Sequence, residues 1–312
     1  MRKISTQWLL ISLFVSSFYA LAQKPAQTPT WTDHKLALEE YPNYQYQGEY
    51  LKGNSGLQVV VVQNKFYVSE YTGGLLGAGW DHSKISHQWL TLEELKRYLA
   101  NAVKHDRGIK VGDYPAPKNA EILFAGQKND KWKFNKIVNN VMMAGARTAK
   151  DYQDFTLHLE FSTPFKPERP LSHPDKGNSG IYLLGLYEVQ IEDSFGLDMA
   201  PSAWQNMEQI KAPESWAGAL YRVKPADINM SLAPLVWQSF DITFTAAKFN
   251  NNQKIHNATI SVWHNGVKIH DNIELSKGTG SKAKLSEVTS GPILFQNHHN
   301  PVQFRNIWLV KH

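Results

Sequence analysis

The segment Tyr187-Glu-Val-Gln-Ile-Glu-Asp193 concentrates the residue types most able to do chemistry. Its polar and apolar residues alternate, so a strand would place Glu188, Gln190 and Glu192 on one face and the apolar residues on the other. With the apolar face packed on a core, the polar face either meets solvent or forms the floor of a groove. The segment therefore predicts a strand that carries a ladder of candidate site residues.

Two carboxylates on one face suggest glycoside hydrolysis. That reaction places its carboxyl groups about 5–5.5 Å apart when configuration is retained and about 6.5–9.5 Å apart when it is inverted. On a strand the Cα atoms of Glu188 and Glu192 would lie ~13 Å apart, and side chains that lean together could meet either distance. The alternative is an ordinary amphipathic strand whose acids are solvated, the commonest fate of glutamate.

Further polar residues flank this strand on predicted loops. The segment Lys176-Gly-Asn178 precedes it, Asp193 follows it, and Gln296-Asn-His-His-Asn300 lies near the C-terminus. His298 and His299 are adjacent, so on a strand they would face opposite ways and would not bind one metal together. One of them could join the carboxylates as a metal ligand or general base, or could make the ordinary hydrogen bonds of a loop histidine.

The elements that must position these residues are predicted to be strands. From Glu121 onward, short alternating segments separated by Gly, Asn and Pro recur about every ten residues. They are 155–161, 187–191, 240–244, 258–263 and 304–309. Asn265-Gly266 is a strong signal for a two-residue hairpin, and the whole pattern indicates an antiparallel β-sandwich or jelly roll. Arg305, in the last strand, is expected to be a structural ion-pair partner more often than a catalytic group.

Residues 31–113 show a different pattern, which indicates a small α+β unit. Strands are predicted at 56–62 and 65–71. Thr91 and Glu94 have the spacing of a capping box, which predicts a helix from there to about Lys104. Its apolar face would consist of Leu92, Leu95, Leu99 and Val103. The segment Tyr114-Pro-Ala-Pro117 then predicts a boundary to a second unit at 118–312.

The N-terminus predicts export. Arg2 and Lys3 precede a short apolar run that ends at Ala20-Leu-Ala22, the pattern of a signal peptide over residues 1–22. The run is too short for a transmembrane helix and no later segment approaches the required length, so no membrane span is expected. Residues 23–30, rich in Pro, Gln and Thr, predict a linker.

Composition excludes several classes of protein. The 312 residues include no cysteine, which rules out disulfide scaffolds, thiolate metal sites and cysteine nucleophiles. The formal net charge is +5, and Lys and Arg form no stripe with interleaved aromatic residues, so no nucleic-acid partner is expected. A hydrophobic content of 42% indicates a packed core rather than disorder.

Several segments, in this order, resemble the 3-keto-disaccharide hydrolase family, long catalogued as a domain of unknown function. They are 155–161, Gly177-Asn-Ser-Gly-Ile-Tyr182, 187–194, Gly218-Ala-Leu-Tyr221, Trp237-Gln-Ser-Phe-Asp-Ile242, 265–266, 291–298 and Val302-Gln-Phe-Arg-Asn-Ile307. The likeness extends over residues 118–312. It implies a concanavalin-like, laminarinase-type jelly roll in a secreted protein of sugar catabolism. Together with the signal-peptide pattern, the resemblance predicts a periplasmic protein.

The resemblance also implies a reaction, the cleavage of glycosides already oxidised to a ketone at C3. The ketone acidifies the C2 proton, so a base can form an enediolate and expel the C1 substituent, and water addition completes the hydrolysis. The electrophile near the C3 oxygen would be a divalent metal ion or a cationic side chain. The catalytic candidates by motif position are Glu188 or His298 as the base and Asp193 as a metal ligand or orienting group. The substrate-binding candidates are Gln190, Lys176, Asn178, Glu192, Gln296 and Arg305.

Two other functions fit the same fold. One is a lectin-like module that binds carbohydrate without turning it over. The other is a laminarinase-type glycosidase that would use Glu188 and Glu192 on unoxidised glucan, although Gln190 stands where those enzymes usually have an acid. His299 stands where the family's loop is expected to have a glycine, and a bulky residue there would narrow or redirect the groove.

Overall fold

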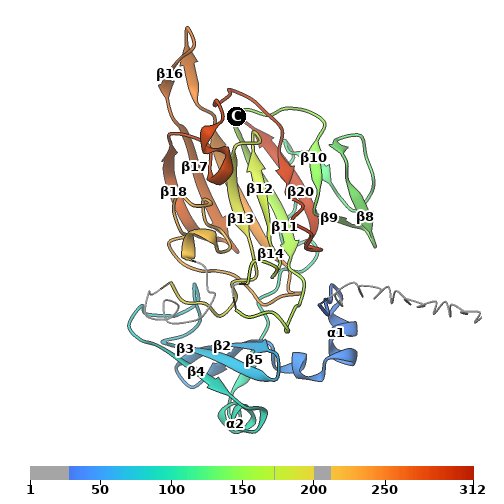
Figure 1. Cartoon of the computed structure of the whole chain (residues 1–312), viewed down its shortest axis with the longest axis vertical. Coiled ribbons are helices and arrows are strands. Elements are labelled where there is room, and N and C mark those ends of the chain that lie inside the picture. The colour runs from blue at the N-terminus through green and yellow to red at the C-terminus, as the bar shows by residue number, and fades with distance from the viewer. Residues whose placement is uncertain (1–27, 172, 200–211) are drawn as a thin grey trace, which may run out of the picture.

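The computed structural model describes residues 28–171, 173–199 and 212–312, and Figure 1 shows a β-sandwich that stands on a smaller sheet. The predicted signal peptide, residues 1–22, and most of the predicted linker lie outside these residues. Within the three ranges, no helix has the length and apolar character needed to cross a membrane.

The smaller sheet comes from the N-terminal part of the chain and is antiparallel, with the strand order β4-β3-β2-β1-β5. Its strands are β1 (Gly48–Lys52), β2 (Ser55–Val62), β3 (Lys65–Thr72), β4 (Ile85–Leu90) and β5 (Val103–His105). Strand β2 is apolar along most of its length because both of its faces are covered. Val59 and Val61 pack in the cluster that includes the helical residues, whereas Val60 packs with Phe195 and Trp216 of the sandwich part.

Two short α-helices accompany this sheet. The sequence signals did not predict α1 (His34–Glu40), which begins at Asp33, whose side chain accepts a hydrogen bond of 2.9 Å from the amide of Leu36. The predicted capping box is confirmed at α2 (Leu92–Tyr98), where Thr91 and Glu94 exchange hydrogen bonds.

The predicted extent of α2 was wrong. The helix ends at Tyr98 and not near Lys104, because the chain turns after Leu99 and enters β5, which pairs with β1. Val103, expected on the apolar face of the helix, lies in that strand and is 70% exposed. Backbone pairing with β1, which is distant in sequence, prevailed over the local helical pattern.

Replacing Thr91 with alanine is expected to lower the free energy of unfolding by about 1 kcal/mol, since the substitution removes the side-chain cap of α2. Urea denaturation of the full chain measures this change. Lys96→Ala, on the exposed side of the same helix, is the control and should leave the midpoint nearly unchanged. Equal midpoints for Thr91→Ala and wild type would show that the cap contributes nothing to stability.

The predicted β-sandwich is confirmed, and it consists of two antiparallel sheets. The larger has the order β18-β17-β14-β11-β20-β9-β8, with β6 also paired to β20, and the smaller has the order β13-β12-β19-β10-β7. The larger sheet contains β6 (Glu121–Phe124), β8 (Lys136–Val138), β9 (Val141–Met143), β11 (Phe155–Ser162), β14 (Gln238–Thr245), β17 (Ala258–His264), β18 (Val267–Leu275) and β20 (Gln303–Lys311). The smaller contains β7 (Trp132–Lys133), β10 (Ala146–Thr148), β12 (Ser179–Leu183), β13 (Tyr187–Ile191) and β19 (Leu294–Phe295).

Alternation along the strands builds the core between these two sheets. Leu157 and Leu159 of β11 belong to the same buried cluster as Val189 and Ile191 of β13. The predicted hairpin joins β17 to β18, and Asn265 and Gly266 both have positive φ, at 51° and 77°, as a type I′ turn requires. A separate hairpin of β15 (Lys248–Asn250) and β16 (Gln253–His256) projects from the top of the sandwich (Figure 1).

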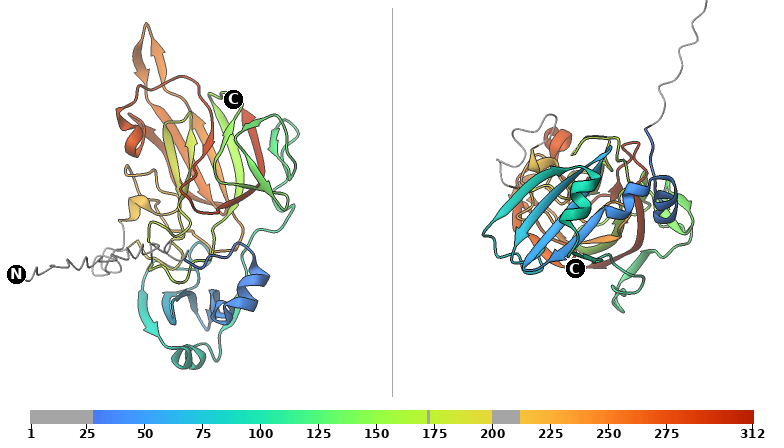
Figure 2. Two further views of the ribbon diagram at one scale, coloured as in Figure 1. Left: turned by 45° about the vertical axis from the view of Figure 1, so that its right-hand side comes forward. Right: turned by 90° about the horizontal axis from the view of Figure 1, so that it is seen from below.

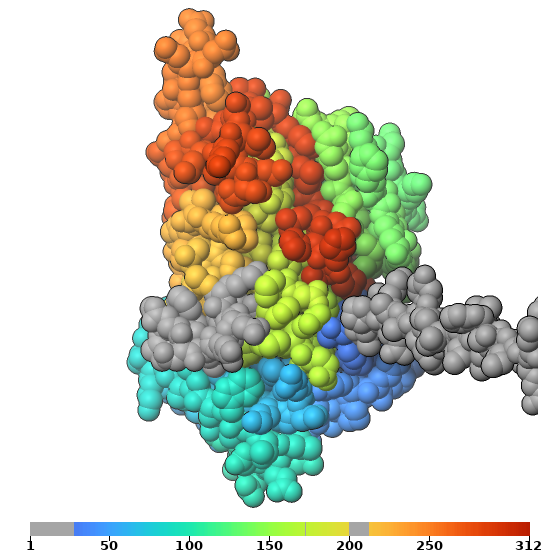
Figure 3. Space-filling model, in the orientation of Figure 1, coloured from blue at the N-terminus to red at the C-terminus, as the bar shows by residue number. Residues whose placement is uncertain are grey.

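The N-terminal sheet packs directly on one end of the sandwich, as the view from below in Figure 2 and the space-filling view in Figure 3 show. Backbone hydrogen bonds of 3.0 and 2.9 Å join Trp31 to Phe165. The Phe165 ring, 2% exposed, contacts the rings of Trp31, Tyr41 and Tyr44 at centroid distances of 5.7, 5.5 and 4.7 Å. The same aromatic cluster therefore belongs to both parts of the chain.

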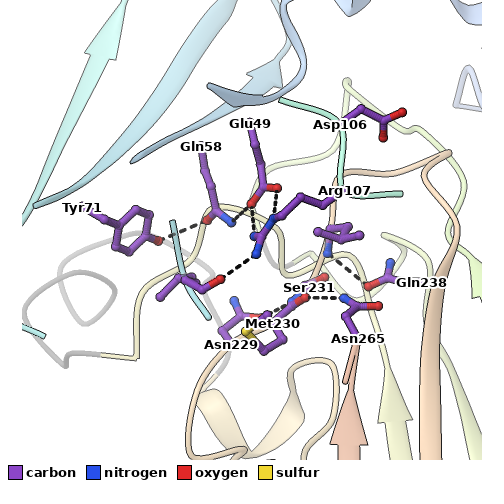
Figure 4. Close-up of polar contacts among 12 residues, drawn as sticks. Glu49, Gln58, Tyr71, Asp106, Arg107, Asn229, Met230, Ser231, Gln238 and Asn265 are labelled. Atoms are coloured by element: carbon purple, nitrogen blue, oxygen red, sulfur yellow. Dashed lines mark hydrogen bonds and ion pairs between the residues drawn. The ribbon is translucent and has the colours of Figure 1, made fainter. Parts of the chain in front are cut away.

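A buried polar network lies at this junction (Figure 4). Arg107 holds Glu49 by two hydrogen bonds, Nε to Oε2 at 2.7 Å and Nη2 to Oε1 at 2.6 Å, and Nη1 donates to the carbonyl of Leu76. Gln58 donates to Glu49 and accepts from Tyr71. The carboxylate is 3% exposed, so these donors replace the water that it has lost.

Candidate functional site

The polar face of β13 is confirmed, and it is buried. Tyr187, Val189 and Ile191 lie in the core, so Glu188 and Gln190 point to the other face of the smaller sheet, where Glu192 follows them. The three polar side chains are 2%, 1% and 0% exposed. The reading of this strand as an ordinary solvated face is therefore wrong.

Glu188 is held by neighbours from two segments. The Tyr182 hydroxyl of β12 donates a 2.7 Å hydrogen bond to Oε2, and the Glu188 amide donates to Thr279 Oγ1 at 2.8 Å. The opposing strand leaves room for the carboxyl because it has Gly180 there, where a Cβ would lie 2.3 Å from Oε1. The glycine in this strand is thus explained by the close approach of the glutamate.

Burial raises the pKa of Glu188 to about 7, because the ionised carboxylate loses its water. The hydrogen bond from Tyr182 and the positive charges of Lys282 and Arg222 act in the opposite direction and favour the ionised form. A carboxyl group with a pKa near neutrality exchanges a proton readily at physiological pH, which suits a general base or acid.

The raised pKa predicts how Glu188 affects stability. The folded protein binds this proton more tightly than the unfolded chain does, so the contribution of Glu188 is fully present below its ordinary pKa. It is lost as the pH rises through about 7, and the loss amounts to about 3 kcal/mol. Unfolding free energies of wild type and Glu188→Gln at about pH 5 and about pH 8 test this. The difference between the two proteins should favour the variant at the higher pH, and a pH-independent difference would contradict the shift.

The other buried candidate residues contact Glu188 or one another. With its amide nitrogen turned toward acceptors, Gln190 donates to Glu188 Oε1 and to the carbonyl of Ser179, both at 3.2 Å. Lys176 Nζ and Asp193 Oδ2 form an ion pair of 3.0 Å in which both side chains are buried. The structure thus brings together most of the predicted site residues. They are Lys176, Asn178, Glu188, Gln190, Glu192 and Asp193.

A depression of about 600 Å³ lies over the outer face of the smaller sheet. Tyr182 lines it, and the Tyr182 hydroxyl donates to Glu188, which is not itself a lining residue. Two cations, Arg147 and Lys282, line the same depression, together with the predicted Gln296. The sequence interpretation missed Tyr182, although alternation along 179–183 places it on the same face as Glu188.

The structure places His298 apart from the buried cluster. The residue is exposed, and the depression next to Tyr182 is lined by Gln296 and Asn297 instead. His299 adopts a φ of 61°, the left-handed conformation that favours the glycine expected at this place in the family's loop. The turn positions Asn300, whose Oδ1 accepts hydrogen bonds from Lys166 Nζ and from the amide of Gly177.

Arg305 lies on the other side of the molecule. It belongs to β20 of the larger sheet, where its neighbour Phe304 faces the core. Its Nε donates to Glu160 Oε2 at 2.6 Å, and its guanidinium lies 4.2 Å from the centroid of the Trp237 ring. A cavity of about 580 Å³ at the junction is lined by Arg305 and Trp237. The expected role as a structural ion-pair partner fits these contacts, whereas a place beside Glu188 does not.

A divalent metal ion was one of the two electrophiles that the sequence suggested. In residues 28–171, 173–199 and 212–312, no three His, Asp or Glu side chains converge as ligands of one ion would. Asp193, proposed as a metal ligand, is paired with Lys176 instead. Around Glu188 the described part of the chain therefore lacks the cluster of acidic and histidine ligands that a metal site would need, whereas two cations line the depression.

Comparisons with known proteins find a family model and several solved structures that are similar to this chain. A family model described as the 3-keto-alpha-glucoside-1,2-lyase-like domain matches residues 119–310. A crystal structure of a proposed glycosyl hydrolase from Parabacteroides distasonis ATCC 8503, at 2.13 Å resolution, is similar with a TM-score of 0.52 and 24% identity, over 63% of this chain and 85% of its own. A second proposed glycosyl hydrolase from the same organism, at 1.70 Å resolution, has a TM-score of 0.44 and 15% identity, over 62% and 94%. No curated protein matches the sequence.

Proposed function

Since the chain belongs to the family of 3-keto-alpha-glucoside-1,2-lyase-like domains, we propose that it cleaves glycosides whose sugar has been oxidised to a ketone at C3. The observation that carries the proposal is the Glu188–Tyr182 pair, in which a buried acid with a pKa of about 7 accepts a hydrogen bond from a tyrosine that lines a depression. The description of the family names a lyase of oxidised glucosides, so membership places the chain among carbohydrate-active domains.

The chemistry follows from the ketone. A carbonyl at C3 makes the C2 proton acidic, because the negative charge left behind spreads onto the C3 oxygen. The resulting enediolate expels the C1 substituent as the C1–C2 double bond forms and the C3 carbonyl returns. Water then adds at C1 and a proton returns to C2, so the net result is hydrolysis. The protein must supply a proton acceptor near C2 and positive charge near the C3 oxygen.

The pair and the cations of the depression match these two needs. The Tyr182 hydroxyl can take the C2 proton while it passes its own proton to Glu188 Oε2, 2.7 Å away. Glu188 is the net acceptor, which suits its pKa, whereas burial and the adjacent carboxylate raise the pKa of Tyr182 far above neutrality. Arg147 and Lys282 provide positive charge toward the developing enediolate. The protonated Glu188 can then return its proton, through Tyr182, to the departing oxygen.

We further propose that the protein is secreted into the periplasm. The proposal rests on the signal-peptide pattern of residues 1–22 and on the family. N-terminal sequencing of the exported protein should give Gln23 as the first residue, and retention of the uncleaved chain in the cytoplasm would refute it.

The deciding experiment is turnover of matched chromogenic glucosides, native and 3-keto, by the purified mature protein with and without a chelator. We expect cleavage of the ketone alone, with no effect of the chelator. Cleavage of the native glucoside would favour a glycosidase that uses Glu188 and Glu192. Binding of both sugars by calorimetry without any turnover would favour the lectin-like alternative.

The pH dependence of kcat/KM tests the role of Glu188 separately. Because the base must be ionised to accept the C2 proton, kcat/KM should rise with pH and level off above an apparent pKa of about 7. In Glu188→Gln, the residual kcat/KM should not show this rise with pH. A profile that is flat from about pH 5 to 9 in the wild type would exclude Glu188 as the proton acceptor.

A further inference from the structure

Phe134 combines two unfavourable features. Its side chain is 82% exposed, although phenylalanine gains most from burial. Its φ is 59°, in the left-handed region that a bulky residue rarely adopts. Backbone strain of this kind persists at positions that clamp ligands, so the outlier calls for a functional explanation.

The position of Phe134 connects it to the depression described above. It directly follows β7, the edge strand of the smaller sheet, and β7 pairs with β10 at Lys133 and Arg147. Phe134 lines the same depression as Tyr182, which lies on β12, three strands away in the sheet. At about 4.8 Å per strand, the two residues are separated by ~14 Å across the sheet. This span exceeds the width of a single sugar ring.

We propose that Phe134 is an aromatic platform that binds the ring of the leaving group, so that this residue makes the site prefer leaving groups with a ring to simple alkyl groups. This proposal depends on the proposed function in one respect, which is that the oxidised sugar ring binds at Tyr182. Between the two ends, the depression is lined by Leu294 and Arg147, which suit the mixed apolar and hydroxyl surface of a sugar. The C–H face of a pyranose ring, or an aryl ring, stacks on an exposed phenyl ring.

The test measures discrimination between leaving groups by the full mature chain. Calorimetry in the Glu188→Gln background compares 3-keto glucosides that carry a methyl, a phenyl or a glucosyl leaving group. Phe134→Ala should weaken binding of the phenyl and glucosyl compounds about tenfold and leave binding of the methyl compound unchanged. Phe134→Tyr, which keeps the ring, should restore binding. Equal loss for all three compounds, or no loss for any, would overturn the proposal.

Phe134→Gly provides a readout that separates binding from folding. Glycine adopts a φ of 59° without strain, so this variant should melt at a higher temperature than wild type while it loses the same leaving-group discrimination. A lower melting temperature would show that the ring is needed for folding and would count against a ligand platform. Trp89→Ala, which removes a half-exposed aromatic residue of β4 in the N-terminal sheet, is the matched control and should not affect discrimination.

The outcomes distinguish this inference from the proposed function. If Phe134→Ala weakens binding of the compounds with a ring as leaving group, but the wild-type protein shows no turnover, the platform is supported and the lyase activity is refuted. The opposite result is also possible. If wild type and Phe134→Ala both turn over 3-keto glucosides, and the ratio of kcat/KM for the phenyl compound to kcat/KM for the methyl compound is the same in both proteins, the platform is refuted and the activity stands.

Discussion

Replacing Glu188 with glutamine is expected to lower kcat on a 3-keto glucoside about a thousandfold while the protein stays folded. Glutamine has the same shape, and its carbonyl oxygen can still accept the hydrogen bond that Tyr182 donates at 2.7 Å. It cannot accept the proton that leaves C2. Since the substitution also removes a carboxyl group that is costly to ionise in a buried position, the melting temperature at neutral pH should not fall.

The chain offers a matched control for this variant. Tyr187 donates a 2.6 Å hydrogen bond to Glu287, a second Tyr–Glu pair, but Glu287 also pairs with Lys254 and does not line the depression. Glu287→Gln should therefore keep wild-type kcat. Similar losses in both variants would indicate a structural effect, and full activity in Glu188→Gln would remove Glu188 from the mechanism.

Replacing Arg107 with methionine is expected to lower the free energy of unfolding by about 3–5 kcal/mol. The change leaves the carboxylate of Glu49 buried at the junction without the two charge-assisted hydrogen bonds that now compensate for its lost hydration. It also removes the donor to the carbonyl of Leu76. Chemical denaturation monitored by tryptophan fluorescence measures the loss in the full chain.

Two further variants show whether the loss comes from the stranded charge. Adding Glu49→Gln to Arg107→Met should recover much of the stability, because the neutral amide is cheaper to bury. Lys110→Met breaks the exposed pair between Lys110 and Asp106 and should change stability little. A double variant no more stable than Arg107→Met would show that packing of the arginine side chain, and not its charge, is what matters.

Most strands of the sandwich could be predicted because their signal is local. Alternation over a few residues identified β11 and β13, and the Asn265-Gly266 turn fixed the hairpin that follows β17. The capping box located the start of α2 for the same reason. The end of α2 depends on pairing of β5 with β1, some fifty residues away in sequence, and no local pattern contains that information.

The alternation of β13 could be predicted from the sequence, but the burial of its polar face could not. The neighbours of Glu188 include Thr279, whose Oγ1 accepts from the Glu188 amide, and Tyr221, whose amide donates to the Glu188 carbonyl. Both come from segments far along the chain, so the sequence pattern alone could not exclude a solvated acid. His298 was placed with the carboxylates by motif order, but its loop turns outward through the left-handed residue His299.

The aromatic cluster around Phe165 has a practical consequence for anyone who wishes to express the sandwich alone. The family match begins at residue 119, yet Trp31, Tyr41 and Tyr44, all upstream of that point, cover the Phe165 ring inside it. A truncated gene product that starts at residue 118 would present this ring, and the backbone groups that now pair with Trp31, to water. Such a fragment would be prone to aggregate, so a shortened protein for crystallisation or engineering should retain the chain from about Thr30 onward.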